Sequence, residues 1–148
     1  MQTFLPVPNF FTTARVLDRQ RLGKQRVEAW QIIRTIRRPK RSNAWAHHPA
    51  VAQWKNYIPA LAAYGAIMCI EWQRRGYKDR MYRRFMCYLR HTSSPIPMPP
   101  WLGFAAYHRS HRSNLLRKDH NYYSQFGWHS SPSAPYIWPA KLRRFRNV

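Results

Sequence analysis

The segment from about residue 59 to residue 76 constrains the fold most, because it is the most apolar part of the chain. Pro59 is favourable in the first turn of a helix. Arg74, Arg75 and Gly76 form the basic last turn and the terminal glycine that commonly end one. Between these ends lie Leu61, Ala62, Ala63, Ile67, Met68, Ile70 and Trp72. A helix with so much apolar surface must be buried, so we expect the other elements to pack around it.

The N-terminal third is predicted to combine an extended arm with a long helix. Residues 1–11 contain Pro6 and Pro8, which exclude a helix there, and their phenylalanine and leucine side chains should anchor the arm on the core. A helical pattern follows from an N-cap at Thr12 or Thr13 to about residue 37. Gly23 costs helix stability, which indicates a close approach by another backbone or by a ligand at this position.

The remaining elements follow from local composition. We expect, in order, a basic loop after residue 38, a short helix after residue 48, a weakly amphipathic helix at 79–90, a Pro-rich loop at 92–100, a helix at about 104–118 and an aromatic, Pro-rich tail. No alternating strand pattern, internal repeat or domain boundary is present. The prediction is therefore an all-α single domain over residues 1–148, with three main helices, several short ones and an extended N-terminal arm.

The charge of the chain indicates its partner. The sequence has 26 Lys and Arg against five acidic residues, a net charge of +21, while 45% apolar residues identify a folded protein. This composition favours nucleic acid, with binding that weakens as salt rises. A membrane is not expected as a partner, since no segment approaches about 18 uncharged apolar residues, and no signal peptide is present.

Cysteine usage indicates the compartment. The two cysteines, Cys69 and Cys87, are too few for a disulfide framework and are expected in the core. We therefore expect a reducing, cytoplasmic setting, at the nucleoid or in a phage-infected cell.

One acidic residue lies where a polyanion would be bound. Glu28 follows a stretch rich in positive charge, with Arg15, Arg21, Lys24 and Arg26. A carboxylate there repels phosphate, so its cost must be offset by an ion pair or by chemistry. A Lys24–Glu28 pair within one helix would contribute only a few tenths of a kcal/mol, so we favour chemistry.

Two further clusters are candidates for contacting DNA. In the last expected helix, His108 and His111 share one face, and so do Arg109 and Arg112; with Asn114 they are typical phosphate contacts. The second cluster consists of His47 and His48 beside Trp45 and Trp54, where aromatic rings could stack on an unpaired base. Many of the aromatic residues must lie in the core, however, and Trp54 is expected to be one of these packing residues.

Several reaction classes lack their residues. The chain has no HExxH or CxxC zinc pattern, no Gly-rich phosphate loop and no DxD cluster, so neither a metal nor a cofactor is expected. A nucleic-acid enzyme with few acids and no metal is limited to amine or acid/base chemistry. A Schiff-base lyase or glycosylase needs only one amine and one carboxylate.

Six motifs resemble those of a known family. They are MQTFLP (1–6), LDRQRLGKQRVE (17–28), HPAV (48–51), EWQRRGY (71–77), HRSHRSNLLRKD (108–119) and PYIWP (135–139). In these motifs the chain resembles the pyrimidine-dimer DNA glycosylase/AP lyase family of the phage endonuclease V type, in its branch of small bacterial and phage relatives. The likeness extends over nearly the whole chain.

The resemblance implies a fold and a mechanism. The fold is a three-helix domain whose N-terminal segment threads between the helices. The terminal amine attacks C1′ of the sugar, expels the base and forms an imine; a glutamate assists, and β-elimination nicks the strand. Glu28 matches that glutamate, and Gln20, Arg21 and Arg26 match its DNA-contacting neighbourhood.

The leading hypothesis is thus a metal-independent glycosylase and AP lyase that acts as a monomer on damaged double-stranded DNA. Gln2 is too large for ordinary removal of methionine, so the amine is expected on Met1, or on Gln2 if Met1 is removed otherwise. Lys24 is the fallback nucleophile. Arg15, Arg21, Arg26, Arg109 and Arg112 are expected to grip phosphates. The alternatives are a non-catalytic basic nucleic-acid-binding protein and a glycosylase for a different damaged or modified base.

Overall fold

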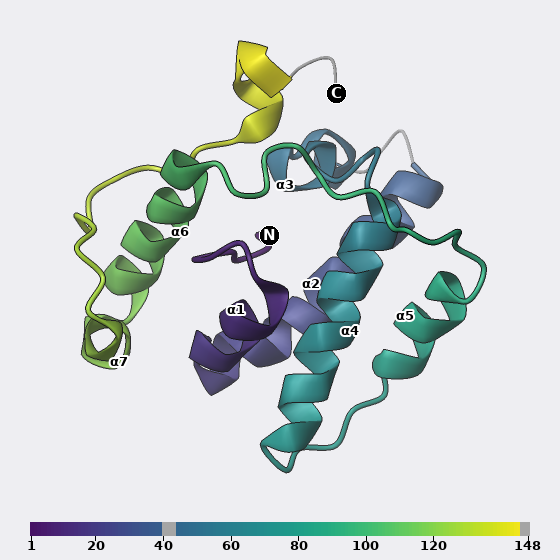
Figure 1. Ribbon diagram of the computed structural model, residues 1–148, viewed down its shortest axis with the longest axis horizontal. Coiled ribbons are helices and arrows are strands. Elements are labelled where there is room, and N and C mark those ends of the chain that lie inside the picture. The colour runs from purple at the N-terminus through teal and green to yellow at the C-terminus, as the bar shows by residue number, and fades with distance from the viewer. Residues whose placement is uncertain (40–43, 146–148) are drawn as a thin grey trace.

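The computed structural model describes residues 1–39 and 44–145 (Figure 1). In that part of the chain all regular structure is helical and no strand occurs, which confirms the all-α class. The longer helices are α2 (Arg19–Arg37), α4 (Ile58–Arg74) and α6 (Ala105–Lys118). The shorter ones are α1 (Phe10–Val16), η1 (Ala44–His47), α3 (Pro49–Ala52), α5 (Tyr82–Leu89), α7 (His120–Tyr123), η2 (Ser124–Phe126), η3 (Pro139–Lys141) and η4 (Arg143–Phe145).

The central pair of the fold is α2 and α4, which pack along each other; α1 and α5 pack on α4 (Figure 1). The sequence prediction for α4 is confirmed: most of its residues are buried, and Gly76 follows its end with φ +92°. Gly65 provides the contact with α5, because a Cβ atom there would lie 2.3 Å from Cζ of the buried Phe85 ring. None of the described helices is long and apolar enough to cross a lipid bilayer.

The prediction of one helix from residue 12 or 13 to residue 37 is wrong at two points. The helix begins earlier, with Asn9 as N-cap accepting from the Thr12 amide, and it breaks after Val16. Asp18 then caps a new helix by accepting from the Arg21 amide at 3.3 Å. An aspartate that satisfies the free amides of a first turn favours a helix start over a helix interior, and this separates α1 from α2.

Arg75 closes the end of α1. Its Nη2 atom lies 3.1 Å from the carbonyl oxygens of Ala14 and Arg15 and 2.8 Å from that of Leu17. The last carbonyls of a helix have no partners within it, so a guanidinium from α4 stabilises the break. The same side chain also donates to Glu71 of α4, so the Arg75 guanidinium links the end of α1 to α4.

Two further predictions about packing are corrected. The close approach at Gly23 is made by a side chain rather than by another backbone: the Trp72 ring lies 3.1 Å from where a Cβ atom would stand. Cys69 is buried as expected, but Cys87 is exposed on α5. The expectation that Trp54 is a packing residue is confirmed: it is fully buried and its Nε1 atom donates to Thr3 Oγ1.

Candidate active site at the N-terminal arm

The N-terminal arm, residues 1–9, lies in the interior of the molecule between α6 on one side and α2 and α4 on the other (Figure 1). Residues 2–6 are buried, whereas Met1 is half-buried. Since an extended arm has no helical hydrogen bonds of its own, its amides and carbonyls must find partners elsewhere when buried. The side chains of the surrounding helices supply them.

Gln25 of α2 is the central partner of the arm. Its Oε1 atom accepts from the Phe4 amide at 2.9 Å, and its Nε2 atom donates to the Gln2 carbonyl at 3.1 Å. The Tyr64 hydroxyl from α4 lies 2.7 Å from both the Phe4 carbonyl and Gln25 Oε1. Gln25 was not among the predicted site residues, although a fully buried glutamine on a helix is a strong sign of a polar task.

Two histidines of α6 hold the next residue of the arm. The Leu5 amide donates to His111 Nδ1 at 3.0 Å, and His108 Nδ1 lies 2.8 Å from the Leu5 carbonyl. The Gly103 amide donates to His108 Nε2, so the proton of His108 is on Nδ1 and points at Leu5. Burial lowers the pKa of both rings, that of His111 to about 3. Both are therefore neutral near pH 7.

These contacts revise the predicted role of the α6 cluster. His108, His111 and Asn114 are buried, and Arg112 donates to the Pro6 carbonyl at 2.6 Å. Asn114 donates to the Ala134 carbonyl and thereby holds the C-terminal segment. A buried side chain presents no atoms to a phosphate in solvent, so in this arrangement the two histidines and Asn114 position the arm and the tail, while Arg112 is half-buried and holds the arm through Pro6. Of the cluster, Arg109 remains exposed.

Glu28 lies at the start of the arm. Its Oε2 atom accepts from the Gln2 amide and from Gln25 Nε2, both at 3.3 Å. Both donors are neutral, and within the described residues no ion pair links Glu28 to a lysine, an arginine or the N-terminal amine. The Lys24–Glu28 pair considered from the sequence therefore does not form.

The other four carboxylates all have structural tasks. Asp18 caps α2 and pairs with Arg21, and Asp119 caps α7 by accepting from the Tyr122 amide. Asp79 pairs with Arg26, and Glu71 with two arginines of α4 and its end. Among the residues that the structure describes, Glu28 is thus the one carboxylate with neither an arginine partner nor a helix to cap, and we take its charge to be available to a ligand.

Open hollows surround this carboxylate. One, of about 240 Å³, is lined by Glu28 together with Met1, Gln2, Phe4, Gln20, Arg21, Lys24, Gln25, Lys118 and Tyr136. A second, of about 590 Å³, also borders both Met1 and Glu28 and includes Trp45. A third, of about 870 Å³, lies along α2 and reaches Glu28 past Lys24 and Val27. The first residue and the glutamate therefore share a space that a substrate can enter.

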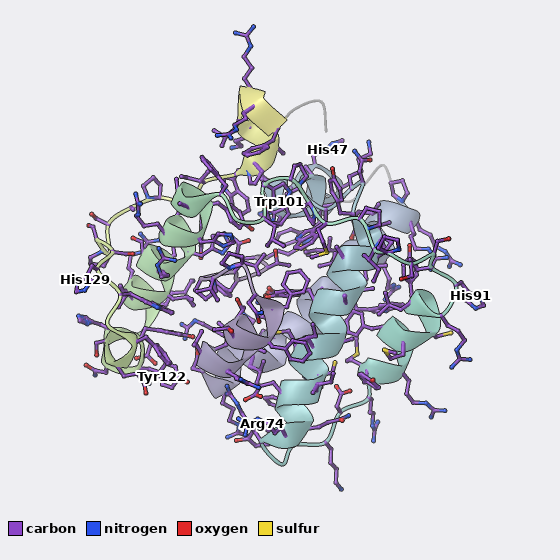
Figure 2. The ribbon with its side chains drawn as sticks, in the orientation of Figure 1. His47, Arg74, His91, Trp101, Tyr122 and His129 are labelled. Carbon is purple, nitrogen blue, oxygen red and sulfur yellow. The ribbon has the colours of Figure 1, made fainter. Side chains whose placement is uncertain are left out.

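His48 belongs to the surroundings of the N-terminal amine. Burial, the positive charge of that amine and Lys141 lower the pKa of His48. Its Nδ1 atom accepts from the Ala50 amide and caps α3, and its ring contacts Trp45 and Trp138. This places His48 beside the start of the chain, whereas His47 is exposed at the end of η1 (labelled in Figure 2).

The structure thus brings only some of the predicted site residues together. Met1, Gln2, Glu28, Gln20, Arg21 and Lys24 line one hollow. Arg15, Arg109 and His47 are exposed elsewhere. Arg26 is held away from the hollow, since its guanidinium pairs with Asp79 and stacks at 4.4 Å on the Trp72 ring.

Within the described residues, His, Cys, Asp and Glu form no cluster that could hold a metal ion. The hollow is lined by the N-terminal residue, by Glu28, whose carboxylate has no counter-ion among those residues, and by basic side chains. An amine and a carboxylate suffice for covalent catalysis through an imine.

Comparison with known proteins adds one finding. A sequence model of a family described as pyrimidine dimer DNA glycosylase matches residues 1–84, more than half of the chain. The matched residues include the arm, α2 with Glu28, and α4. No curated protein and no solved structure matches the chain.

Proposed function

The chain belongs to the pyrimidine dimer DNA glycosylase family, and from that premise we propose that it removes the base at pyrimidine dimers in duplex DNA through an imine on its N-terminal amine. The observation that carries this proposal is the state of Glu28. It is a carboxylate that forms no ion pair within residues 1–39 and 44–145, is hydrogen-bonded to the amide of residue 2, and borders a hollow that residue 1 also lines.

The proposed reaction has two stages. The nitrogen lone pair of the unprotonated amine attacks C1′ of the damaged nucleotide, the C1′–N bond of the base breaks, and the base leaves with the bonding electron pair and is then protonated. Loss of the amine protons and opening of the sugar ring give the imine, with a hydroxyl at C4′. In the lyase stage a proton leaves C2′ and the C3′–O bond breaks, so that the 3′ phosphate departs and the strand is nicked.

Glu28 is proposed to act on protons in both stages. In this proposal Glu28 accepts a proton from the attacking amine and stabilises the positive charge that develops on the sugar. A glutamine at this position keeps the hydrogen bond from Gln2 but loses the charge and the basicity. The sequence of steps uses only groups of this chain, which is why we propose a metal-independent mechanism.

The position of Gln2 bears on which amine reacts. Its nitrogen is an amide 3.3 Å from the glutamate, and removal of Met1 would turn that atom into the terminal amine. With Met1 present, the amine belongs to the residue before Gln2, and Met1 lines two hollows that Glu28 also borders. We propose Met1 as the nucleophile, with Gln2 and Lys24 as the alternatives that mapping of the adduct distinguishes.

The test is borohydride trapping on three duplexes that are identical except for a thymine dimer, an abasic site or no damage. We expect an adduct on the first two, mapped by mass spectrometry to the N-terminal peptide. An adduct on Lys24 would still support imine chemistry but would identify Lys24, not Met1, as the nucleophile. Salt-sensitive binding to all three without any adduct would support a plain nucleic-acid-binding protein and refute the enzyme.

Glu28→Gln is the companion variant. We expect DNA binding to persist and strand cleavage to fall by about 10²–10⁴-fold, the usual contribution of a positioned acid or base. Asp119→Asn, which removes a carboxylate outside the hollow, is the matched control and should cleave like the parent. If binding and cleavage fall together in Glu28→Gln, the glutamate is structural.

A further inference from the structure

A second basic surface extends from the candidate active site to α5. Beyond the hollow that borders Met1 and Glu28, the exposed side chains of Arg34 and Arg38 also line a smaller hollow of about 240 Å³. That hollow shares Trp30, Arg37 and Arg84 with a larger one of about 1010 Å³. Because neighbouring hollows share their lining residues, they form one continuous depression, which we call the arginine groove.

The groove carries positive charge without a local counter-charge. Its two hollows at the α5 end are lined by six arginines and no aspartate or glutamate among the described residues. The six are Arg34, Arg37, Arg38, Arg83, Arg84 and, at the far edge, Arg90. His91, labelled in Figure 2 beyond the end of α5, marks the same edge.

Aromatic rings, not carboxylates, hold two of these arginines. The guanidinium of Arg37 lies over the Tyr88 ring at 5.6 Å from its centre, and that of Arg84 lies over Trp30 at 5.9 Å. Trp30 in turn packs edge-on against the buried Phe85 ring. A stacked guanidinium is restrained in position, yet it keeps its full charge and its N–H groups for another partner.

Other arginines of the chain differ from these two because they do have carboxylate partners. Arg21, Arg26, Arg74 and Arg75 are each paired with a carboxylate, so much of their charge is already compensated. Arg37 and Arg84 are preorganised without that compensation. Such an arrangement lowers the entropic cost of binding an anion while keeping the full attraction.

We propose that the arginine groove binds the phosphate backbone of the duplex arm on one side of the lesion. Glu28 and Arg37 are nine positions apart on α2, which corresponds to about 14 Å along the helix axis. A DNA strand advances about 3.4 Å per phosphate along its axis. The groove therefore matches roughly four consecutive phosphates, starting next to the site of chemistry. Its occupant follows from charge and from continuity with a site for DNA, so the inference rests on the proposed function for its choice of partner.

The first test measures equilibrium binding to an undamaged duplex over a range of salt concentrations, with Arg37→Gln/Arg84→Gln. Two lost phosphate contacts should reduce the slope of log K against log salt by about 1.8. The control is Lys55→Gln/Lys78→Gln, which removes the same charge from exposed lysines outside the groove and should change the slope far less. Equal slopes for the two double variants would overturn the proposal, because net charge alone would then explain the binding.

The second test shortens the duplex on either side of an abasic site. In the parent and the lysine control, shortening the duplex arm that the groove holds should weaken binding. In the arginine variant, shortening the same arm should change the binding affinity little. If the arginine variant responds to both truncations like the parent, the groove does not hold an arm. If it loses binding to phosphatidylserine-containing vesicles and keeps binding to DNA, the groove faces a membrane and the proposal is wrong.

These measurements separate the two proposals. The salt series uses undamaged DNA and binding alone, so it tests the groove whether or not the protein forms an imine. If borohydride traps no adduct but the salt slopes of the arginine and lysine variants differ, the imine chemistry is refuted and the groove proposal stands. If an adduct is trapped but the two slopes are equal, the groove proposal is refuted and the imine chemistry stands.

Discussion

Acidification should loosen the N-terminal arm through His111, and the size of the effect follows from its environment. The ring is fully buried, and its Nδ1 atom accepts the Leu5 amide, so a proton on Nδ1 would remove the acceptor and place a charge in the core. Burial accordingly lowers the pKa of His111 from 6.5 to about 3. The folded state resists protonation, whereas the unfolded chain takes up the proton below about pH 6.5.

The direction of the pH effect on stability follows from these two pKa values. Between pH 6.5 and 3 the unfolded state binds more protons, so the free energy of unfolding decreases as the pH falls. With these two pKa values, linkage predicts a loss of about 2 kcal/mol between pH 7 and pH 5 from His111 alone. His108, whose pKa burial also lowers, adds a loss of the same sign.

The choice of pH window isolates the histidines. Hydrogen bonds and arginine partners lower the pKa of Asp18, Glu71 and Asp79 below their ordinary values of 3.8 to 4.5, despite burial. Those carboxylates consequently titrate below the window. Protonation effects between pH 7 and pH 5 then report on buried imidazole.

Urea unfolding at pH 7 and pH 5 measures the effect. The His111→Gln variant, which can still offer an oxygen to the Leu5 amide, should be less stable at pH 7 but should lose about 2 kcal/mol less than the parent on acidification. His129→Gln, an exposed position at the outer edge of the molecule (Figure 2), should follow the parent. Parallel losses in the parent and His111→Gln would refute the reasoning.

Three further substitutions test the packing that positions the site. Gly65→Ala should lower the free energy of unfolding by roughly 1–3 kcal/mol, because the new methyl group would overlap the Phe85 ring; an unchanged urea midpoint would show that the ring moves aside at no cost. Asp18→Ala should cost about 0.5–2 kcal/mol through the lost cap of α2, and helical content measured by circular dichroism should fall with it. Gln25→Leu leaves the Phe4 amide without its acceptor, at a cost of about 1–3 kcal/mol, and should speed amide exchange at residues 3–5; exchange at the parental rate would contradict the role given to Gln25.

Local patterns predicted the helices well, but not their ends. The apolar composition of α4 and the basic, glycine-terminated end of that helix are properties of consecutive residues, and the structure confirms both. The break between α1 and α2 was missed because the helical pattern continues across it. In the sequence, an aspartate at a helix start and one inside a helix look alike. Only the path of the backbone in space distinguishes them, and the stabilising contact from Arg75 comes from the end of another helix.

The faces of α6 show a second kind of limit. His108 and His111 do share one face, as their spacing predicts, but that face meets the arm rather than DNA. The arm lies more than 100 residues earlier in the chain. Periodicity identifies residues that point the same way and carries no information about which distant segment covers them.

The sequence by itself determined the helical class, the strong positive charge and the membership of its first 84 residues in a family of DNA glycosylases. It also singled out Glu28 by its basic neighbours. Only the tertiary structure decided which carboxylate, within the described part of the chain, has neither an arginine partner nor a helix to cap, since Asp79 meets Arg26 across 53 positions and Gln2 meets Glu28 across 26. Ion pairing and burial depend on contacts between distant parts of the chain, and these exist only once the helices have packed around the arm.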